Sequence, residues 1–368
     1  MWGRIVACLP LLICALAPVP ATGGLAWRPL AFAGTPTGPL ALAQEGRVIY
    51  LATTHGLHLS EDGGETWRYV GAHLERQAAP DVIALAVDAR DPAVAYAGTE
   101  RGRAGGLYVT RDAGLHWQRL FAGRREDGVR AVAASDERPP TLLAVAVAHD
   151  GVDDELVASA DGGETWQVVL REAGTPLANK LYALYFAPRP LSGAFAVASQ
   201  GVLVAGDASG RWTSALTRQD PVYALAFDPL EGRALYAIAR RAVLHSADGG
   251  LTWREVTGPA LGACHVYERG GLVAGPPTAP ALFAVARSLC PDAPARLFAL
   301  LPEAMGDVRW AEVGEGLPPV STAQLAVAGG AAPRLYAATP DGLWVADLPA
   351  DLARARATET GPTDAPRE

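Results

Sequence analysis

The chain has almost no lysine and few charged residues of either sign. Lys180 is the only lysine, so arginine supplies the other 30 of the 31 basic residues, and charged residues make up 19% of a chain with a net charge of −8. An acidic chain without a basic stripe is poorly suited to bind nucleic acid or anionic membrane surfaces. The composition therefore argues against nucleic acid as a partner, and we attribute the preference for arginine to the source genome.

A long apolar run occurs only at the N-terminus, over Ile5–Ala17. Arg4 precedes this run, and the small residues Val19–Ala21 follow it. This three-part arrangement is typical of a secretory signal peptide, and the apolar run is shorter than a typical transmembrane helix. We predict a signal peptide over residues 1–21 and a mature chain without a transmembrane span, located outside the cell, in a periplasm or on the cell surface.

Two other interpretations of the N-terminus remain open. Cys14 follows Leu11-Leu12-Ile13, which resembles a lipoprotein acylation site, although the bulky Ile13 argues against acylation. An uncleaved N-terminal anchor is the second alternative.

Cysteine is scarce as well. Once residues 1–21 are removed, only Cys264 and Cys290 remain. An even pair in an oxidising compartment is more simply a disulfide than a metal site or a nucleophile. The predicted mature chain has no further cysteine or close histidine cluster that would complete a zinc site. We therefore predict a structural disulfide and no metal or cofactor.

No part of the mature chain shows a capped stretch with helical spacing, which excludes a βαβ architecture. Instead, short segments rich in β-branched and aromatic residues recur between turn residues, as in Ala84–Asp88, Tyr96–Thr99 and Gly106–Thr110. A tryptophan follows each group of three such segments, at intervals of about 40 to 60 residues, the range of a four-stranded propeller blade. These tryptophans are Trp67, Trp117, Trp166, Trp212, Trp253 and Trp310.

This repeat predicts an all-β fold, a seven-bladed β-propeller with four-stranded antiparallel blades. Residues 22–349 would form the propeller, and residues 350–368 a disordered tail, because the tail is polar and has no periodicity. The seven blades are expected at residues 38–70, 81–120, 129–169, 181–216, 222–256, 262–313 and 322–348.

The seventh predicted blade lacks its tryptophan strand. Trp27-Arg28-Pro29-Leu30, within residues 24–32, is similar to Trp253-Arg254-Glu255-Val256 and could supply that strand from the other end of the chain. Closing the ring in this way would leave no inner strand edge exposed. Pro29 is compatible with an outermost strand, where a missing N–H donor is tolerated.

The turn before the tryptophan is the most specific motif. Ser60–Trp67 recurs closely at 159–166 and 246–253, with one change at 110–117, while 205–212 keeps only Asp207 and Trp212. In such a turn the aspartate accepts backbone N–H groups and the glycines supply positive φ. We assign a structural role to Asp62, Asp112, Asp161, Asp207 and Asp248, with Trp67, Trp117, Trp166, Trp212 and Trp253.

These turns resemble the Asp-box, or bacterial neuraminidase repeat, with the pattern Ser/Thr-x-Asp-x-Gly-x-Thr-Trp. The resemblance places each aspartate in a separate blade, so the carboxylates cannot converge on one substrate. No catalytic residue is assigned.

The loops that enter each innermost strand carry most of the polar residues of the repeat. Loops on a rigid scaffold are the usual place for recognition. We predict a binding face there, with these residues as candidates: Arg124, Arg125, Arg130, Lys180 and Arg218.

An exported seven-bladed propeller of Asp-box repeats resembles the photosystem II assembly and stability factor family. That resemblance implies a non-enzymatic scaffold that binds a protein partner through an arginine-lined face. We also expect the chain to be a monomer. Neuraminidases share the repeat, so a glycoside hydrolase or a carbohydrate-binding propeller with a glycan at the axial loops is the alternative. The nearest match to the neuraminidase Phe/Tyr-Arg-Ile-Pro motif is Trp27-Arg28-Pro29-Leu30, which lacks the isoleucine.

Overall fold

The computed structural model describes most of the predicted propeller, namely residues 25–32, 34–71, 74, 81–88, 90–100, 105–121, 128–147, 154–171, 180–189, 191–206, 211–256, 261, 264–290, 293–302, 308–318 and 323–349. The predicted signal peptide, the predicted tail, Asp207 and the candidate residues Arg124 and Arg125 lie outside the described residues. Within them, no helix is long and apolar enough to cross a membrane.

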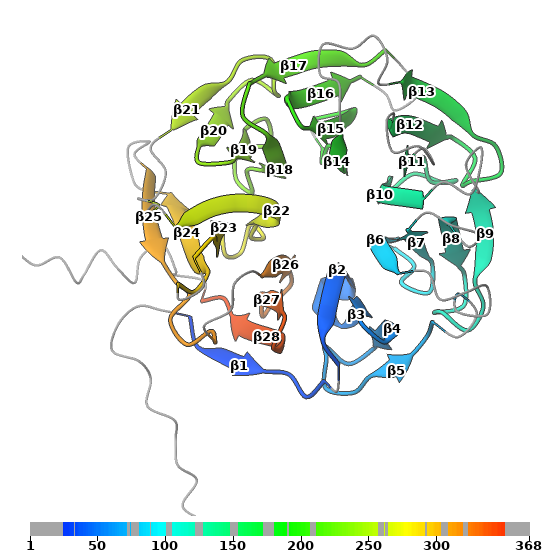
Figure 1. Cartoon of the computed structure of the whole chain (residues 1–368), viewed down its shortest axis with the longest axis horizontal. Helices are drawn as coiled ribbons and strands as arrows, with labels where there is room; N and C mark the ends of the chain where they lie inside the picture. The colour runs from blue at the N-terminus through cyan, green and yellow to red at the C-terminus, as the bar shows by residue number, and fades with distance from the viewer. Residues whose placement is uncertain are drawn as a thin grey trace, which may run out of the picture.

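Seven four-stranded antiparallel sheets form a ring, which confirms the predicted fold (Figure 1). In each of the first six blades, four strands consecutive in sequence run from the innermost to the outermost position.

The strands of blades 1 to 4 are β2 (Pro36–Ala43), β3 (Val48–Thr53), β4 (Gly56–Ser60) and β5 (Arg68–Tyr69); β6 (Val82–Val87), β7 (Ala95–Thr99), β8 (Gly106–Thr110) and β9 (Gln118–Phe121); β10 (Gly128–Ala134), β11 (Leu142–Val147), β12 (Asp154–Ser159) and β13 (Gln167–Arg171); β14 (Leu181–Phe186), β15 (Ala194–Ala198), β16 (Gly201–Ala205) and β17 (Thr213–Thr217). A short 3-10 turn, η1 (Gln44–Gly46), joins β2 to β3.

The strands of blades 5 to 7 are β18 (Val222–Phe227), β19 (Leu235–Ala239), β20 (Val243–Ser246) and β21 (Arg254–Val256); β22 (His265–Ala274), β23 (Leu282–Ser288), β24 (Arg296–Pro302) and β25 (Val308–Glu312); and β26 (Gln324–Ala328), β27 (Arg334–Thr339) and β28 (Gly342–Asp347) with β1 (Trp27–Pro29).

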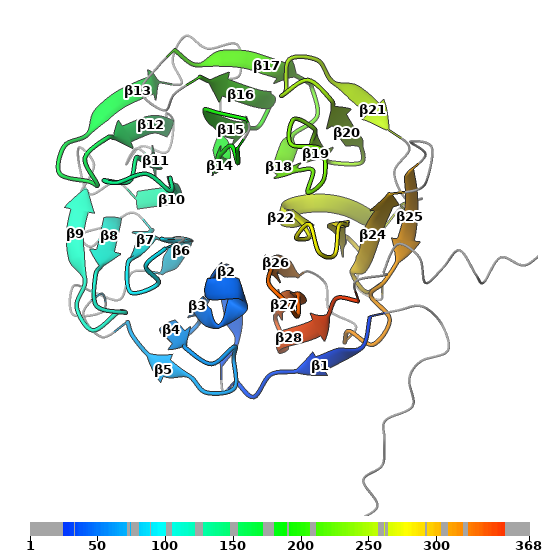
Figure 2. The same cartoon turned by 180° about the vertical axis from the view of Figure 1, so that it is seen from behind.

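The N-terminal strand closes the ring, as the sequence predicted. β1 pairs antiparallel with β28, and Trp27 lies opposite Ala346. Both views show β1 outside β28, at the start of the chain and beside its last strand (Figures 1 and 2). The Trp27 indole Nε1 donates to the carbonyl oxygen of Val313 in blade 6 at 3.2 Å, so the closing strand also contacts the neighbouring blade.

The hydrophobic core lies between the blades. Each buried cluster combines side chains of two neighbouring blades, as where Tyr50 of β3 packs with Ala95 and Tyr108 of blade 2. The second strands β3, β7, β15 and β19 are buried along their whole length, which explains their near-continuous apolar sequences. The last blade and the first share the cluster that includes Leu30, Ile49 and Tyr336, so closure buries apolar surface as well as a strand edge.

The antiparallel order gives the ring two different ends. At one end, which we call the aspartate-turn end, a turn connects the first strand of a blade to the second, and another connects the third strand to the fourth. There the N–H of Gly63 donates to the carbonyl oxygen of Arg47 at 2.8 Å. At the other end, which we call the crossover end, a turn connects the second strand to the third, and the fourth strand leads to the first strand of the next blade. There the N–H of Ser199 donates to the carbonyl oxygen of Lys180 at 2.9 Å.

Candidate binding site at the crossover end

The aspartate turns are closed hydrogen-bonded units. The Ser60 hydroxyl donates to Asp62 Oδ1 and accepts the N–H of Gly64, both at 2.8 Å. Asp62 then accepts the N–H of Thr66 at 2.9 Å and the Thr66 hydroxyl at 2.5 Å. The bonds from Thr66, and next that from Ser60, lower the pKa of Asp62 to about 2. The turns that contain Asp161 and Asp248 repeat these contacts.

The second turn keeps the aspartate but replaces the threonine with His116. Asp112 Oδ1 accepts the N–H of His116 at 2.8 Å, and its Oδ2 lies 2.7 Å from the imidazole Nδ1. The Trp117 indole donates to the carbonyl oxygen of Val70 in blade 1 at 2.9 Å, whereas the Trp67 indole donates to Gly64 in its own turn. Each of these carboxylates thus makes its contacts inside one turn at the aspartate-turn end, away from the crossover end.

At the crossover end, four consecutive innermost strands contain the same irregularity. In β6, β10, β14 and β18 the pairing register shifts by one residue near the start of the strand. A bulge inserts one extra residue into a strand and re-aims its side chain, and bulges are over-represented next to functional sites. The inserted residues, which we call the bulge residues, are Ile83, Arg130, Tyr182 and Tyr223.

The bulge residues lie around the axis of the ring, because the innermost strands surround that axis (Figure 1). Tyr182 of blade 4 and Tyr223 of blade 5 are both partly buried, and their ring centroids are 6.0 Å apart with the planes tilted by 36°. On the same two strands, the Tyr185 hydroxyl accepts the N–H of Leu225 at 3.3 Å and links β14 to β18. Two blades therefore present one aromatic pair on a fixed backbone.

Arg130 is held by a buried carboxylate. Its Nη1 lies 2.6 Å from Asp154 Oδ2, and only 7% of the Asp154 side chain is exposed. The same oxygen accepts the N–H of Leu181 at 3.1 Å, so Asp154 links blade 3 to blade 4. Burial raises the pKa of Asp154, and the positive charges of Arg130 and Lys180 oppose that rise.

The other predicted binding residues lie at different distances from the axis. Lys180 is exposed and directly precedes β14, so it lies beside Asp154 and the aromatic pair. Arg218 follows the outermost strand of blade 4, and its Nη1 lies 3.4 Å from Glu255 Oε2 on the outermost strand of blade 5. The structure therefore brings Arg130 and Lys180 together, whereas Arg218 lies at the outer rim.

Three of the four bulge residues, together with Asp154, were not among the predicted site residues. The first strands share the pattern Val/Leu-x-Ala, as in Val82–Ala84, Leu181–Ala183 and Val222–Ala224, and the bulge residue is the variable position x. A position that varies between otherwise similar repeats was the signal available in the sequence.

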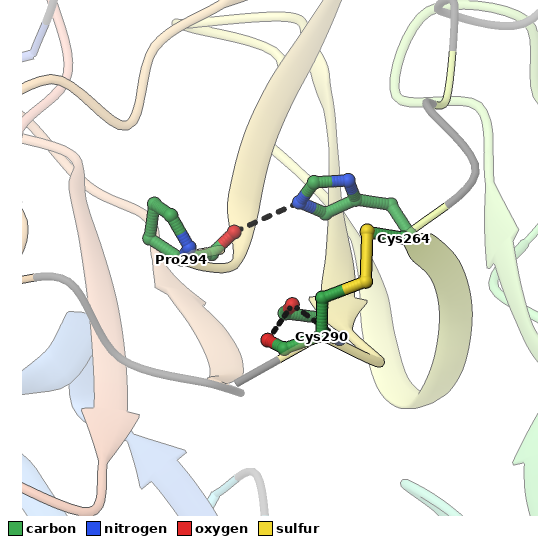
Figure 3. Close-up of a disulfide and its surroundings, with 5 residues drawn as sticks. Cys264, Cys290 and Pro294 are labelled. Atoms are coloured by element: carbon green, nitrogen blue, oxygen red, sulfur yellow. Dashed lines mark hydrogen bonds between the residues drawn. A yellow bond between two sulfur atoms is a disulfide. The ribbon is translucent and has the colours of Figure 1, made fainter. Parts of the chain in front are cut away.

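The predicted disulfide is present at the same end. Cys264 and Cys290 are joined with an S–S distance of 2.02 Å (Figure 3). The N–H of Leu289 donates to the carbonyl oxygen of Cys264 at 2.7 Å, and His265 Nε2 lies 2.8 Å from the carbonyl oxygen of Pro294. The bridge therefore fixes the loop between β23 and β24 to the start of β22. Among the described residues, no group of three or more His, Cys, Asp or Glu side chains is arranged to hold a metal ion.

Comparison with known proteins shows that this chain is similar in fold to several solved structures. No family model matches the chain, and no curated protein matches it. Among solved structures, a YCF48 protein bound to a D1 peptide has a TM-score of 0.59 at 15% identity, and the match covers 89% of this chain and 97% of YCF48.

Two larger proteins also contain a similar ring. An ancestral GH74 enzyme has a TM-score of 0.63 at 16% identity, and the match covers 85% of this chain and 45% of the enzyme. The extracellular domain of a putative one-component system from B. thetaiotaomicron has a TM-score of 0.60 at 11% identity, with 88% and 40% covered. This chain spans less than half of either of them and nearly the whole length of YCF48. Its ring is similar to a protein that was solved with a bound peptide and to part of an enzyme, and the likeness concerns the fold.

Proposed function

We propose that this chain is a non-enzymatic, exported scaffold that binds a polypeptide partner at the crossover end, around the axis. One observation carries the proposal. Four consecutive blades have the same bulge at the same place, and the bulges present an isoleucine, an arginine and two tyrosines, namely Ile83, Arg130, Tyr182 and Tyr223. A rigid scaffold that presents varied side chains at one end is the usual arrangement for recognition.

The chemistry of these residues favours a peptide segment that carries an acidic and an apolar side chain. Arg130 and Lys180 supply positive charge, and Tyr182 and Tyr223 supply an aromatic surface. Tyrosine and arginine are enriched among residues that dominate binding energy in interfaces. The similarity in fold to YCF48, which was solved with a peptide and matches over nearly its whole length, supports this assignment.

Export is supported by the disulfide, because such bridges persist in oxidising compartments. The similarity in fold to an extracellular domain also supports export. The N-terminal segment that resembles a signal peptide adds a third, independent reason.

The alternative is a carbohydrate-binding or glycoside-hydrolysing propeller, and the tyrosine pair is the observation that favours it. Aromatic faces also stack against sugar rings. Asp154, the buried carboxyl group beside the pair, accepts hydrogen bonds from Arg130 and the backbone of Leu181, so we assign it to the fold and not to acid catalysis.

The test uses site-directed cross-linking in the envelope of the native host. A photoreactive phenylalanine analogue replaces Tyr223, and a second variant carries it at Tyr69, an exposed tyrosine on the outer strand of blade 1. We expect a cross-link to one defined protein from position 223 and none to that protein from position 69. Equal labelling from both positions, or binding of a glycan array with release of sugar from aryl-glycosides, would contradict the proposal.

A further inference from the structure

A second surface lies at the opposite end of the ring, between blades 5 and 6. Two turns of the aspartate-turn end border an open cleft there, the connection from β18 to β19 and the connection from β22 to β23. The floor of the cleft is formed by the buried side chains of Tyr236, Leu282 and Leu300. The remaining lining residues are Asp228, Pro229, Leu230, Pro280 and Ala281. We call this the apolar cleft.

Leu230 stands at the edge of the cleft with 59% of its surface exposed. It is presented by a rigid turn, because the N–H groups of Leu230 and Glu231 both donate to Asp228 Oδ1 at 2.8 Å. The N–H of Asp228 donates to the carbonyl oxygen of Ala234 at 2.9 Å and closes the turn. Leu251, in the aspartate turn of the same blade, is 76% exposed. One blade thus displays two large aliphatic side chains to solvent at one end.

The matching position of blade 2 shows that this arrangement is not a property of the repeat. There the N–H groups of Arg90 and Asp91 donate to Asp88 Oδ1, so the same turn presents an arginine. The cleft beside it is lined by charged side chains, among them Asp91 and Arg111. Burying apolar surface is the main favourable contribution to association. The lining of the cleft between blades 5 and 6 is mainly apolar, whereas charged side chains make up about half of the lining of the cleft at blade 2.

The charges around the apolar cleft indicate which partner it fits. Asp228 lines the cleft, and Glu231 is exposed on the same turn. Burial raises the pKa of Tyr236 to about 12, and the negative charges of Asp228 and Glu231 add to that rise, against Arg254. Arg233 lies in the same turn, but neither arginine lines the cleft. The edge of the cleft is therefore acidic.

We propose that the apolar cleft is a second docking site, which takes a bulky aliphatic or aromatic side chain of a partner polypeptide with a lysine or arginine next to it. The apolar side chain would pack on Leu230, Leu282 and Leu300, and the basic neighbour would lie against Asp228 and Glu231. This surface is independent of the site at the crossover end. A chain with both would bring two polypeptides to opposite ends of one rigid ring.

The experiment selects random octapeptides displayed on phage against the whole mature protein. We expect the recovered peptides to share an apolar residue beside a basic one. Leu230→Ala should lower their recovery by about tenfold or more, as for loss of a central interface side chain. Glu231→Arg should lower it through charge repulsion. Leu115→Ala is the matched control, since Leu115 is an equally exposed leucine in the aspartate turn of blade 2.

Three results would overturn the proposal. Peptides recovered equally well with Leu230→Ala as with the parent would show that the cleft does not bind them. A failure to enrich any apolar and basic pattern would show the same. The third result is that the parent self-associates in sedimentation, that Leu230→Ala abolishes this self-association and that Leu115→Ala does not. The occupant of the cleft would then be a second copy of this chain.

Discussion

Replacing Ser60 with alanine removes the hydroxyl that organises the first aspartate turn. Ser60 is 1% exposed, and its Oγ accepts the N–H of Gly64 at 2.8 Å in a buried bond. The alanine variant keeps the backbone but leaves that N–H buried without a partner. Such a group costs about 1–3 kcal/mol of the free energy of unfolding. The lost bond to Asp62 Oδ1 also removes one of the contacts that lower the pKa of Asp62.

Urea unfolding followed by tryptophan fluorescence measures this loss, from the shift in midpoint at constant slope. Glu65→Ala is the control in the same turn, because the Glu65 side chain is exposed and a surface substitution changes stability by less than about 0.5 kcal/mol. Ser246→Ala should repeat the effect of Ser60→Ala, since the buried N–H of Gly250 donates to Ser246 at 2.8 Å. Unfolding of both serine variants at the same midpoint as Glu65→Ala would refute a structural role for these hydroxyl groups.

Four further predictions concern pH, the disulfide, closure and the binding face. The pKa of Asp62, Asp112 and Asp248 is lowered to about 2, so their contribution to stability is present above about pH 4 and is lost as the pH falls toward 2; Asp248→Asn should make acid unfolding in that range less steep. Cys290→Ser should lower the free energy of unfolding by about 3–4 kcal/mol in the chain-entropy account, and free thiols in the unreduced, denatured parent would contradict the bridge. Deleting residues 22–32 should expose the edge of β28 and cause aggregation, so a truncated chain that elutes as a monomer with an unchanged melting temperature would contradict closure by β1. Charge reversal at Arg124 and Arg125 should weaken the binding of an acidic partner and reduce the salt dependence of binding, with an unchanged melting temperature. An unchanged affinity would exclude these two residues from the proposed binding face.

Much of the fold could be predicted because its signals are local. The aspartate of each turn is hydrogen-bonded to residues only a few positions away, so a short pattern such as Ser60–Trp67 defines the turn. The closing strand could be found because Trp27–Leu30 resembles the outermost strand of another blade. The disulfide followed from having only one pair of cysteines beyond the predicted signal peptide.

The candidate site could be predicted only in part, because its geometry depends on residues from different blades. A bulge at Tyr182 or Tyr223 is set by the register between two strands, which the residue itself does not reveal. Arg130 was expected to face a partner, but it is also bound to Asp154, a contact that needs β10, β12 and β14 to meet. The apolar cleft likewise exists only because blades 5 and 6 lie side by side.

The central claim is that the aromatic pair at the crossover end binds a polypeptide. The most direct measurement compares the affinity of the protein cross-linked from position 223 for the parent, for the double variant Tyr182→Ala/Tyr223→Ala and for Tyr69→Ala. We expect the double variant to lose about 2 kcal/mol or more of binding free energy, a loss typical of interface tyrosines, and Tyr69→Ala to keep the affinity of the parent. A double variant that folds like the parent and binds this protein as tightly would contradict the central claim.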